Sequence, residues 1–285
     1  MEPPYVAMII PDGSNQYFSR LAQLVQRELS RASAGMLLFD SDSSASNERS
    51  YIQWIAEQRR KGSVQAVVYI PSGDNFENFK GLFQLDLPVV ILDREVPEDL
   101  SRNQIDHVLA DNSFGMKLVV DHLIELGVMH VVYLAGATKT EPGRARNAAF
   151  KQYWEEVPEP RSSHVAFAGD FSFESGRRAG QAILALQQQP DAVVAANDLM
   201  ALGIMQSLQR SGRRVPDDVI IIGYDDIPLA NWVYPTLTTV RQDVEEMARI
   251  AAGHVMRRVS GEGNQGAIRT PIEPELVRRE SSRRG

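Results

Sequence analysis

The chain has 285 residues, 43% hydrophobic and 24% charged, which suits a globular protein of about two domains. Its 30 basic and 37 acidic residues give a net charge of −7, so its own surface is poorly suited to binding a nucleic-acid backbone. The absence of cysteine excludes disulfides, thiolate metal sites and cysteine nucleophiles. No apolar run approaches the ~20 residues of a membrane span, and the first residues lack the basic flank of a secretory signal. We therefore expect a cytoplasmic protein without membrane contact.

The first hundred residues alternate short apolar runs with amphipathic segments. Apolar positions recur on one helical face between residues 18 and 29, and shorter helical patterns surround Tyr51 and residues 76–83. Strands are expected at 5–10, 36–39, 66–70 and 88–92. This alternation predicts a parallel, doubly wound sheet.

The same alternation restarts after residue 106. Strands are expected at 107–110, 131–134, 164–167, 192–196 and 219–222, with helical patterns between them. After Pro235 the order changes to a β-branched run at 236–240, a helix at 242–259 and one or two short strands within 268–277. One helix with flanking strands is too small for a domain, so we expect it to cross back and complete earlier layers. The sequence thus predicts two α/β lobes joined by several chain crossings, an arrangement suited to hinge closure over a cleft.

Six of the predicted strand ends carry polar or aromatic side chains that together suit a sugar. The carboxyl ends of parallel strands share one edge of a sheet, where ligands bind. Carboxylates, amides and guanidinium groups can bond several hydroxyls, and aromatic rings can cover the apolar faces of a sugar. The candidate ligand-binding residues are Asn15, Tyr17, Phe18, Asp93, Arg94, Arg146, Phe171, Asn197, Asp225 and Gln242.

Each of these residues also has a structural interpretation. Polar residues at strand ends cap helices more often than they bind ligands, and we assign Asp198 and Asp226 to that role. Phe18 and Phe171 could equally pack in a core, and Arg146 could be a solvated residue at a helix start. The matched set, rather than any single member, favours a binding site.

The sequence lacks the motifs of common catalytic sites. It has no phosphate-binding G-x-x-x-x-G-K-S/T loop, no G-x-G-x-x-G after the first strand, no G-x-S-x-G elbow and no H-E-x-x-H. Its five histidines are scattered without ligand-spaced partners. We therefore expect no catalytic residues, no metal and no cofactor, and an α/β enzyme acting on sugars or nucleotides is the least favoured alternative.

Seven stretches carry a resemblance to a known family. The sequence resembles the effector-binding core of LacI/GalR-type (lactose/galactose-repressor) transcription regulators in IIPDGSNQYF, VVILDR, ADNSFGMKLVVDHLIELG, GDFSFESGRRA, AANDLMALG, VPDDVIIIGYDDIPLA and PTLTTVRQD. Periplasmic sugar-binding proteins of the ribose type share this core. The resemblance spans residues 5–281 and implies a periplasmic-binding-protein-like type I fold, two lobes joined by three crossings. The N-terminal lobe would be 1–109 plus 242–269 and the C-terminal lobe 110–241 plus 270–285, with the ligand cleft between them.

The ribose-type pocket pattern of the family falls on the ten candidate residues. Tyr17 replaces the usual phenylalanine, and Ala149 replaces a glycine that usually follows the pocket arginine. The set favours a pentose-like monosaccharide, although relatives of this kind also bind disaccharides, nucleosides and phosphorylated sugars.

The resemblance implies the effector-binding and dimerisation domain of a transcriptional regulator. Such a domain would act as a homodimer and reach operator DNA only through a helix-turn-helix headpiece that is missing here. We expect that the headpiece was removed from this chain. The alternative is a sugar-binding receptor of an ABC transporter, for which the full gene would encode a signal peptide in place of a headpiece.

Overall fold

Two α/β units make up the chain in the computed structural model, which describes residues 4–73, 77–85, 87–95, 105–157, 163–262 and 266–283. The first unit is Met1–Ala110 with Asp243–Ile272, and the second is Asp111–Gln242 with Glu273–Gly285. Phe76, the expected start of a helix, lies outside the described residues, as do the outermost residues 1–3 and 284–285 of the predicted lobes.

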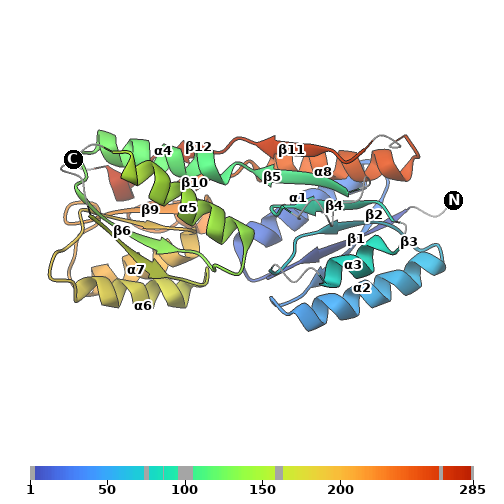
Figure 1. Ribbon diagram of the computed structural model, residues 1–285, viewed down its shortest axis with the longest axis horizontal. Helices are drawn as coiled ribbons and strands as arrows, with labels where there is room; N and C mark the ends of the chain where they lie inside the picture. Colours follow the sequence, from blue (N-terminus) through green and yellow to red (C-terminus); the bar gives the residue numbers. More distant parts are fainter. Residues whose placement is uncertain are drawn as a thin grey trace. The chain divides into compact units, whose positions relative to one another are not determined.

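The first unit is a parallel sheet with helices on both faces (Figure 1). Its strand order is β11-β5-β4-β3-β1-β2, and every pairing is parallel. The strands are β1 (Tyr5–Ile10), β2 (Gly35–Asp40), β3 (Val64–Tyr69), β4 (Val89–Leu92), β5 (Ile105–Ala110) and β11 (Arg269–Ile272). The helices are α1 (Gln16–Arg31), α2 (Ala45–Arg60), α3 (Glu77–Phe83) and α8 (Val244–Val259). Helix α1 packs beside α8, and α2 beside α3 on the other face.

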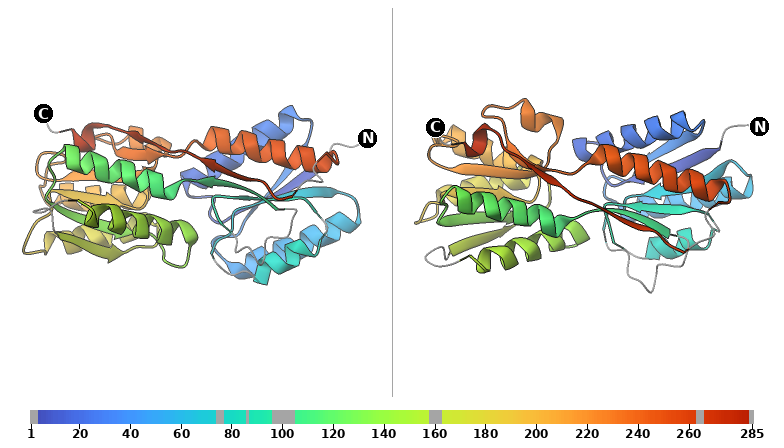
Figure 2. Two further views of the ribbon diagram at one scale, coloured as in Figure 1. Left: turned by 45° about the horizontal axis from the view of Figure 1, so that its top comes forward. Right: turned by 90° about the horizontal axis from the view of Figure 1, so that it is seen from above.

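The second unit repeats this plan with one antiparallel edge strand. Its strand order is β12-β10-β9-β8-β6-β7, in which only β12 runs against its neighbour. The strands are β6 (His130–Ala135), β7 (Ser163–Ala168), β8 (Ala192–Ala195), β9 (Ile220–Asp225), β10 (Thr238–Arg241) and β12 (Glu275–Val277). The helices are α4 (Asn112–Glu125), α5 (Glu141–Glu155), α6 (Phe173–Leu184) and α7 (Asp198–Arg210), with 3-10 turns at Pro228–Asn231 and Glu280–Ser282. Helix α4 packs beside α5, and α6 beside α7 on the opposite face (Figure 2).

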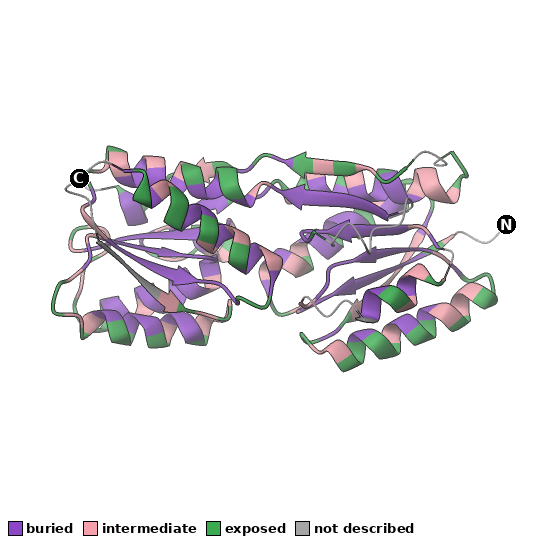
Figure 3. Cartoon of the chain, viewed as in Figure 1, coloured by how far each residue is buried: buried purple, intermediate pink, exposed green. Residues whose placement is uncertain are grey.

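The strands form the core because helices cover both faces of each sheet. All residues of β4, β5, β8 and β9 are buried, and the exposed positions lie mainly on the outer sides of the helices (Figure 3). Apolar, partly β-branched runs are what a strand buried on two faces requires. The predicted α/β class with two doubly wound, mainly parallel sheets is confirmed.

A buried carboxylate ties the last helix of the first unit to its sheet. Asp106 on β5 accepts from Arg258 Nη2 at 2.7 Å and Nε at 3.0 Å, and from Ile268 N at 2.8 Å. His254 Nδ1 lies 3.2 Å from the same carboxylate. Burial alone would raise the pKa of Asp106, but the hydrogen bonds from His254 and Arg258 outweigh it and hold that pKa below its usual range.

In both units, helices begin within a few residues of a strand end. Asn15 caps α1, Asp111 caps α4, Ser172 caps α6 and Asn197 caps α7, each with its side-chain oxygen accepting a backbone N–H. The candidate residues therefore gather at the carboxyl edge of each sheet. No helix within the described ranges is both long and apolar enough to cross a membrane.

Candidate functional site

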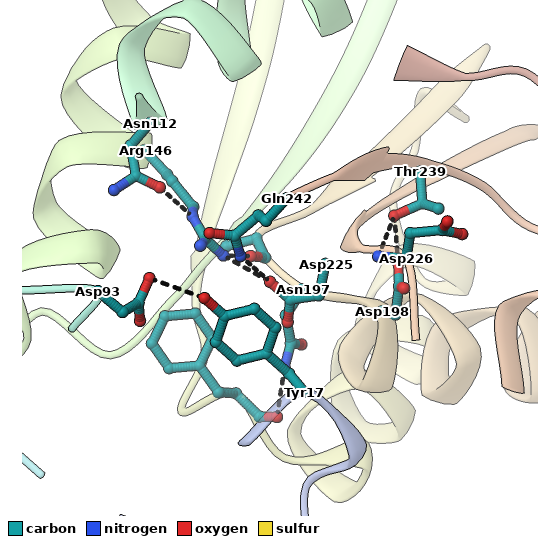
Figure 4. A network of polar contacts seen from close by, with 12 residues as sticks. Tyr17, Asp93, Asn112, Arg146, Asn197, Asp198, Asp225, Asp226, Thr239 and Gln242 are labelled. Carbon is teal, nitrogen blue, oxygen red and sulfur yellow. Dashed lines mark hydrogen bonds and ion pairs between the residues drawn. The ribbon is translucent and has the colours of Figure 1, made fainter. Parts of the chain in front are cut away.

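A first cluster, comprising Asn15, Tyr17, Phe18, Asp93 and Arg94, lies at the carboxyl edge of the first unit. The Tyr17 hydroxyl donates to Asp93 Oδ1 at 3.1 Å, a contact 76 residues apart in sequence (Figure 4). Asn15 Oδ1 accepts from Tyr17 N at 3.0 Å, which fixes the first turn of α1. The Phe18 ring meets the Tyr17 ring edge-on at 5.1 Å. The structure thus brings these predicted residues together from the N-terminal end of α1 and the turn after β4.

The Arg94 side chain holds a neighbouring loop by a hydrogen bond. Its Nε donates to Pro71 O at 3.1 Å, just beyond β3, and the residue is buried. Asp93 before it has a φ of 59°, a left-handed conformation, and its N–H bonds Val108 O at 2.9 Å. The turn after β4 is therefore fixed by the adjacent strands, and the Asp93 carboxylate accepts the Tyr17 hydroxyl from this turn.

A second cluster, comprising Arg146, Phe171, Asn197, Asp225 and Gln242, lies in the second unit, and Arg146 is at its centre. Arg146 is only 3% exposed, so the interpretation as a solvated residue at a helix start is wrong. Its Nε donates to Asn112 Oδ1 at 2.7 Å, and its Nη1 donates to Ala196 O at 2.7 Å. Its guanidinium carbon lies 3.7 Å from the centroid of the Tyr224 ring. These contacts fix the plane of the guanidinium group.

Asp225 links Arg146 to Gln242. Its Oδ1 accepts from Gln242 Nε2 at 2.8 Å and from Arg146 Nη1 at 3.3 Å (Figure 4). Asp225 is 8% exposed and Gln242 is 2% exposed, so the carboxylate is held in a largely desolvated setting. Residues from α5, the end of β9 and the segment after β10 thereby form one polar group that combines a cation, an anion and an amide.

Asn197 has a structural use as well as a place in the second cluster. Its Oδ1 accepts from Met200 N at 3.0 Å as the cap of α7, and its Nδ2 donates to Phe171 O at 3.0 Å. Phe171 has a φ of 70° and its side chain lies over Gly136, where an added Cβ would be 2.2 Å from the ring Cζ. Phe171 is partly buried, so its ring can pack against the protein and still belong to the second cluster.

Asp198 and Asp226 were expected to be helix caps, but their carboxylates make other contacts: Asp226 pairs with the side chains of Arg241 and Arg279. The cap of α7 is Asn197, and Asp198 instead accepts from Ile227 N at 2.9 Å and contacts Thr239 Oγ1 at 2.6 Å (Figure 4). Asp198 is fully buried, and burial followed by the negative charge of Asp225 raises its pKa well above the usual range. The neutral, protonated carboxyl is thus favoured at this position.

Two supporting residues were not predicted. Asn112, directly after the predicted strand at 107–110, orients Arg146, and Tyr224 places its ring under the same guanidinium. Asp111 and Asn112 form a polar pair directly after that strand, and this pattern could have indicated Asn112 as a site residue. Tyr224 adjoins Asp225 in sequence, but nothing in the sequence indicates which arginine its ring contacts.

Both clusters combine a carboxylate with hydroxyl, amide or guanidinium donors, which is the chemistry that polyhydroxylated molecules need. Across the residues that the structure describes, no group of three or more histidine, aspartate or glutamate side chains could hold a metal ion. The donors and acceptors of the two clusters suit hydrogen bonding to a polar organic molecule.

Comparison with known proteins gives a consistent set of relatives. A family model described as a periplasmic binding protein-like domain matches residues 120–282. The ribose operon repressor of Halalkalibacterium halodurans is 29% identical over 280 residues, which cover 98% of this chain and 80% of that protein.

Solved structures extend the comparison to the fold. A LacI family transcriptional regulator from Arthrobacter sp. FB24 in complex with lactose matches with 27% identity and a TM-score of 0.84, covering 98% of this chain and 100% of that one. A LacI family regulator from Enterococcus faecium with bound ribose matches with 23% identity and a TM-score of 0.83, covering 98% of each chain. At that identity the second match shows the fold alone.

Proposed function

Because the chain belongs to the periplasmic binding protein-like domain family, we propose that it senses a small sugar and controls DNA binding by a transcriptional regulator. The resemblance to LacI-type regulators predicted from the sequence is confirmed, since the similar proteins are named as repressors and regulators. This favours a regulator over the alternative of a transporter receptor. The observation that carries the proposal is the buried group formed by Arg146, Asp225 and Gln242.

The second cluster suits a hydroxyl that both donates and accepts. A sugar hydroxyl placed between Arg146 and Asp225 would donate to the carboxylate and accept from the guanidinium group, and hydrogen bonds to charged groups are the stronger ones. In the first cluster, Tyr17 and Asp93 offer the same pairing of hydroxyl and carboxylate. Aromatic rings of the two clusters would cover the apolar faces of the sugar.

We propose that one ligand uses residues of both clusters. The predicted lobes, residues 1–109 plus 242–269 and 110–241 plus 270–285, would each supply part of the site. A pentose-like monosaccharide is the favoured effector, because a ribose operon repressor is among the relatives. A disaccharide is the competing candidate, because the regulator from Arthrobacter binds lactose.

Regulation would follow from the preference of the effector for one conformation. A ligand can shift a conformational equilibrium only by its differential affinity for the two states. We propose a homodimer in the cytoplasm that contacts operator DNA through a separate headpiece. The net charge of −7 supports a separate headpiece for DNA binding, because this chain is poorly suited to contacting DNA phosphates itself. No enzymatic step is proposed.

Calorimetric titration with ribose, arabinose, xylose, galactose, lactose and cellobiose tests the proposal. We expect one of these sugars to bind, and Arg146→Met to weaken its binding by roughly 10- to 100-fold, the equivalent of losing a charged hydrogen bond of ~1.5–3 kcal/mol. Arg144→Met is the matched control, since Arg144 is exposed on the same helix.

Two outcomes would contradict the proposal. One is that the wild-type protein binds none of these sugars, and the other is that Arg146→Met binds as tightly as Arg144→Met. Chromatography of the bound sugar after long incubation separates binding from catalysis, because a binding protein returns the sugar unchanged.

A further inference from the structure

The exit of β9 carries Asp225 on a backbone that requires support. The φ of Asp225 is 113° and that of Asp226 is 52°, both in the left-handed region that residues other than glycine rarely adopt. Such conformations persist only where surrounding contacts hold them. The contacts of Asp226 therefore influence where the Asp225 carboxylate lies.

Two arginines hold the Asp226 carboxylate, one at each oxygen. Arg279 Nη2 lies 2.6 Å from Oδ1, and Arg241 Nε lies 2.6 Å from Oδ2. The Arg279 side chain is 13% exposed and its Nη1 also donates to Leu237 O at 2.8 Å, whereas the Arg241 side chain is 45% exposed. Arg241 also pairs with the exposed Glu275 at 2.7 Å, so the two arginines differ in burial rather than in the number of contacts. Arg279 is the more desolvated partner, and breaking a buried pair affects a structure more than breaking an exposed one.

The backbone of Arg279 is fixed by neighbouring strands of the second unit. Arg279 N donates to Thr238 Oγ1 at 2.7 Å, and Thr238 N donates to Ser281 Oγ at 2.8 Å. Ser281 Oγ in turn donates to Ile221 O at 2.6 Å. The segment 279–282 is therefore hydrogen-bonded to both β9 and β10. These bonds hold the backbone from which the Arg279 side chain extends to Asp226.

We propose that Arg279 is a positioning residue for the effector site. Its ion pair with Asp226 keeps the exit of β9 in the conformation that presents Asp225 to Arg146 and Gln242. The inference rests on the proposed function, because it treats Asp225 as a ligand-binding carboxylate. Arg279 acts through Asp226 and makes no contact with the effector itself.

Arg279→Gln and Arg278→Gln are a matched pair for the test. The Arg278 side chain is 49% exposed and pairs with Glu125, also exposed, at 2.7 Å. In the ligand-free protein, we expect Arg279→Gln to speed amide hydrogen exchange in the peptide 222–230 by about tenfold, while Arg278→Gln leaves it unchanged. Arg279→Lys should restore part of the protection, because lysine keeps the charge but lacks the second donor.

Titration of the same variants with the sugars named above gives the second readout. We expect Arg279→Gln to weaken binding by about tenfold relative to Arg278→Gln, with Arg279→Lys between them. Burial and the nearby charge of Arg278 lower the pKa of His122, and Arg278→Gln removes the second cause. Both readouts are therefore taken at about pH 8, above the ordinary histidine pKa, so that His122 stays neutral in every variant.

Each outcome decides the question. Unchanged exchange in Arg279→Gln would refute the positioning role, and so would faster exchange with unchanged sugar affinity. If the wild-type protein binds no sugar, the proposed function fails, and the exchange comparison still decides whether Arg279 holds the exit of β9.

Discussion

The buried carboxyl of Asp198 gives a sharp test of the electrostatics beside the second cluster. Its raised pKa means that the folded protein keeps a proton which the unfolded chain loses above about pH 4. Unfolding then releases a proton, so the stability of the wild-type protein falls as pH rises from about 4 toward the raised pKa. Asp198→Asn mimics the protonated carboxyl, since its amide can accept from Ile227 N and donate to Thr239 Oγ1.

The expected magnitude follows from proton linkage. Over that pH window the unfolding free energy of Asp198→Asn, minus that of the wild type, should rise by up to ~1.4 kcal/mol for each pH unit. The carboxyl packs tightly against the backbone of Gly223, where a Cβ would lie 2.1 Å from Asp198 Oδ1, and the asparagine amide has nearly the same size and shape. The slope should therefore reflect the proton rather than a change of packing.

Urea unfolding at intervals of pH measures this difference. A Trp54→Phe background removes the tryptophan of the first unit, so fluorescence reports the second unit through Trp154 and Trp232. Asp121→Asn, at an exposed ion pair, serves as the control and should stay parallel to the wild type. Parallel profiles for Asp198→Asn and the wild type would refute a protonated Asp198.

Two further variants probe the first unit and the second cluster. Asp106→Ala should destabilise the protein by about 3–5 kcal/mol in urea unfolding, because it leaves Arg258 buried without its carboxylate. Since the pKa of Asp106 is depressed, this stabilisation is present above about pH 4 and is lost as pH falls, so an equal effect in acid would contradict the assignment. Gly136→Ala should displace the Phe171 ring and weaken sugar binding by about two- to tenfold, or ~0.5–1.5 kcal/mol, in calorimetry. Unchanged affinity would argue against a role for that ring.

Strands buried on both faces could be predicted from sequence because their apolar runs are unbroken. The run at 219–222 correctly located β9, but the strand continues to Asp225 because Gly223 and Tyr224 pair with β10. Hydrophobicity does not register that pairing, since it comes from backbone hydrogen bonds to a strand later in the sequence. Similarly, the helix predicted from Gln242 begins at Val244, and Gln242 instead directs its amide to Asp225.

The candidate site was predictable as a set of positions but not as a set of contacts. The topology of a parallel sheet places strand ends at one edge, which is why Arg146 and Asp225, 79 residues apart, could be proposed for one site. Their distance and their burial depend on α5 packing and on Asn112, which no local pattern encodes. Arg94 also bonds a backbone carbonyl, a use that its side-chain chemistry alone does not indicate.

The interleaving of the two units has a consequence for synthesis on the ribosome. The second unit takes residues 111–242 as one uninterrupted run, whereas the first must wait for α8 and β11 before its sheet is complete. The half of the protein that is translated first is therefore finished late, and the edge strand β12 is added last of all. A message truncated near residue 272 would release a chain whose β10 edge is unpaired and open to aggregation.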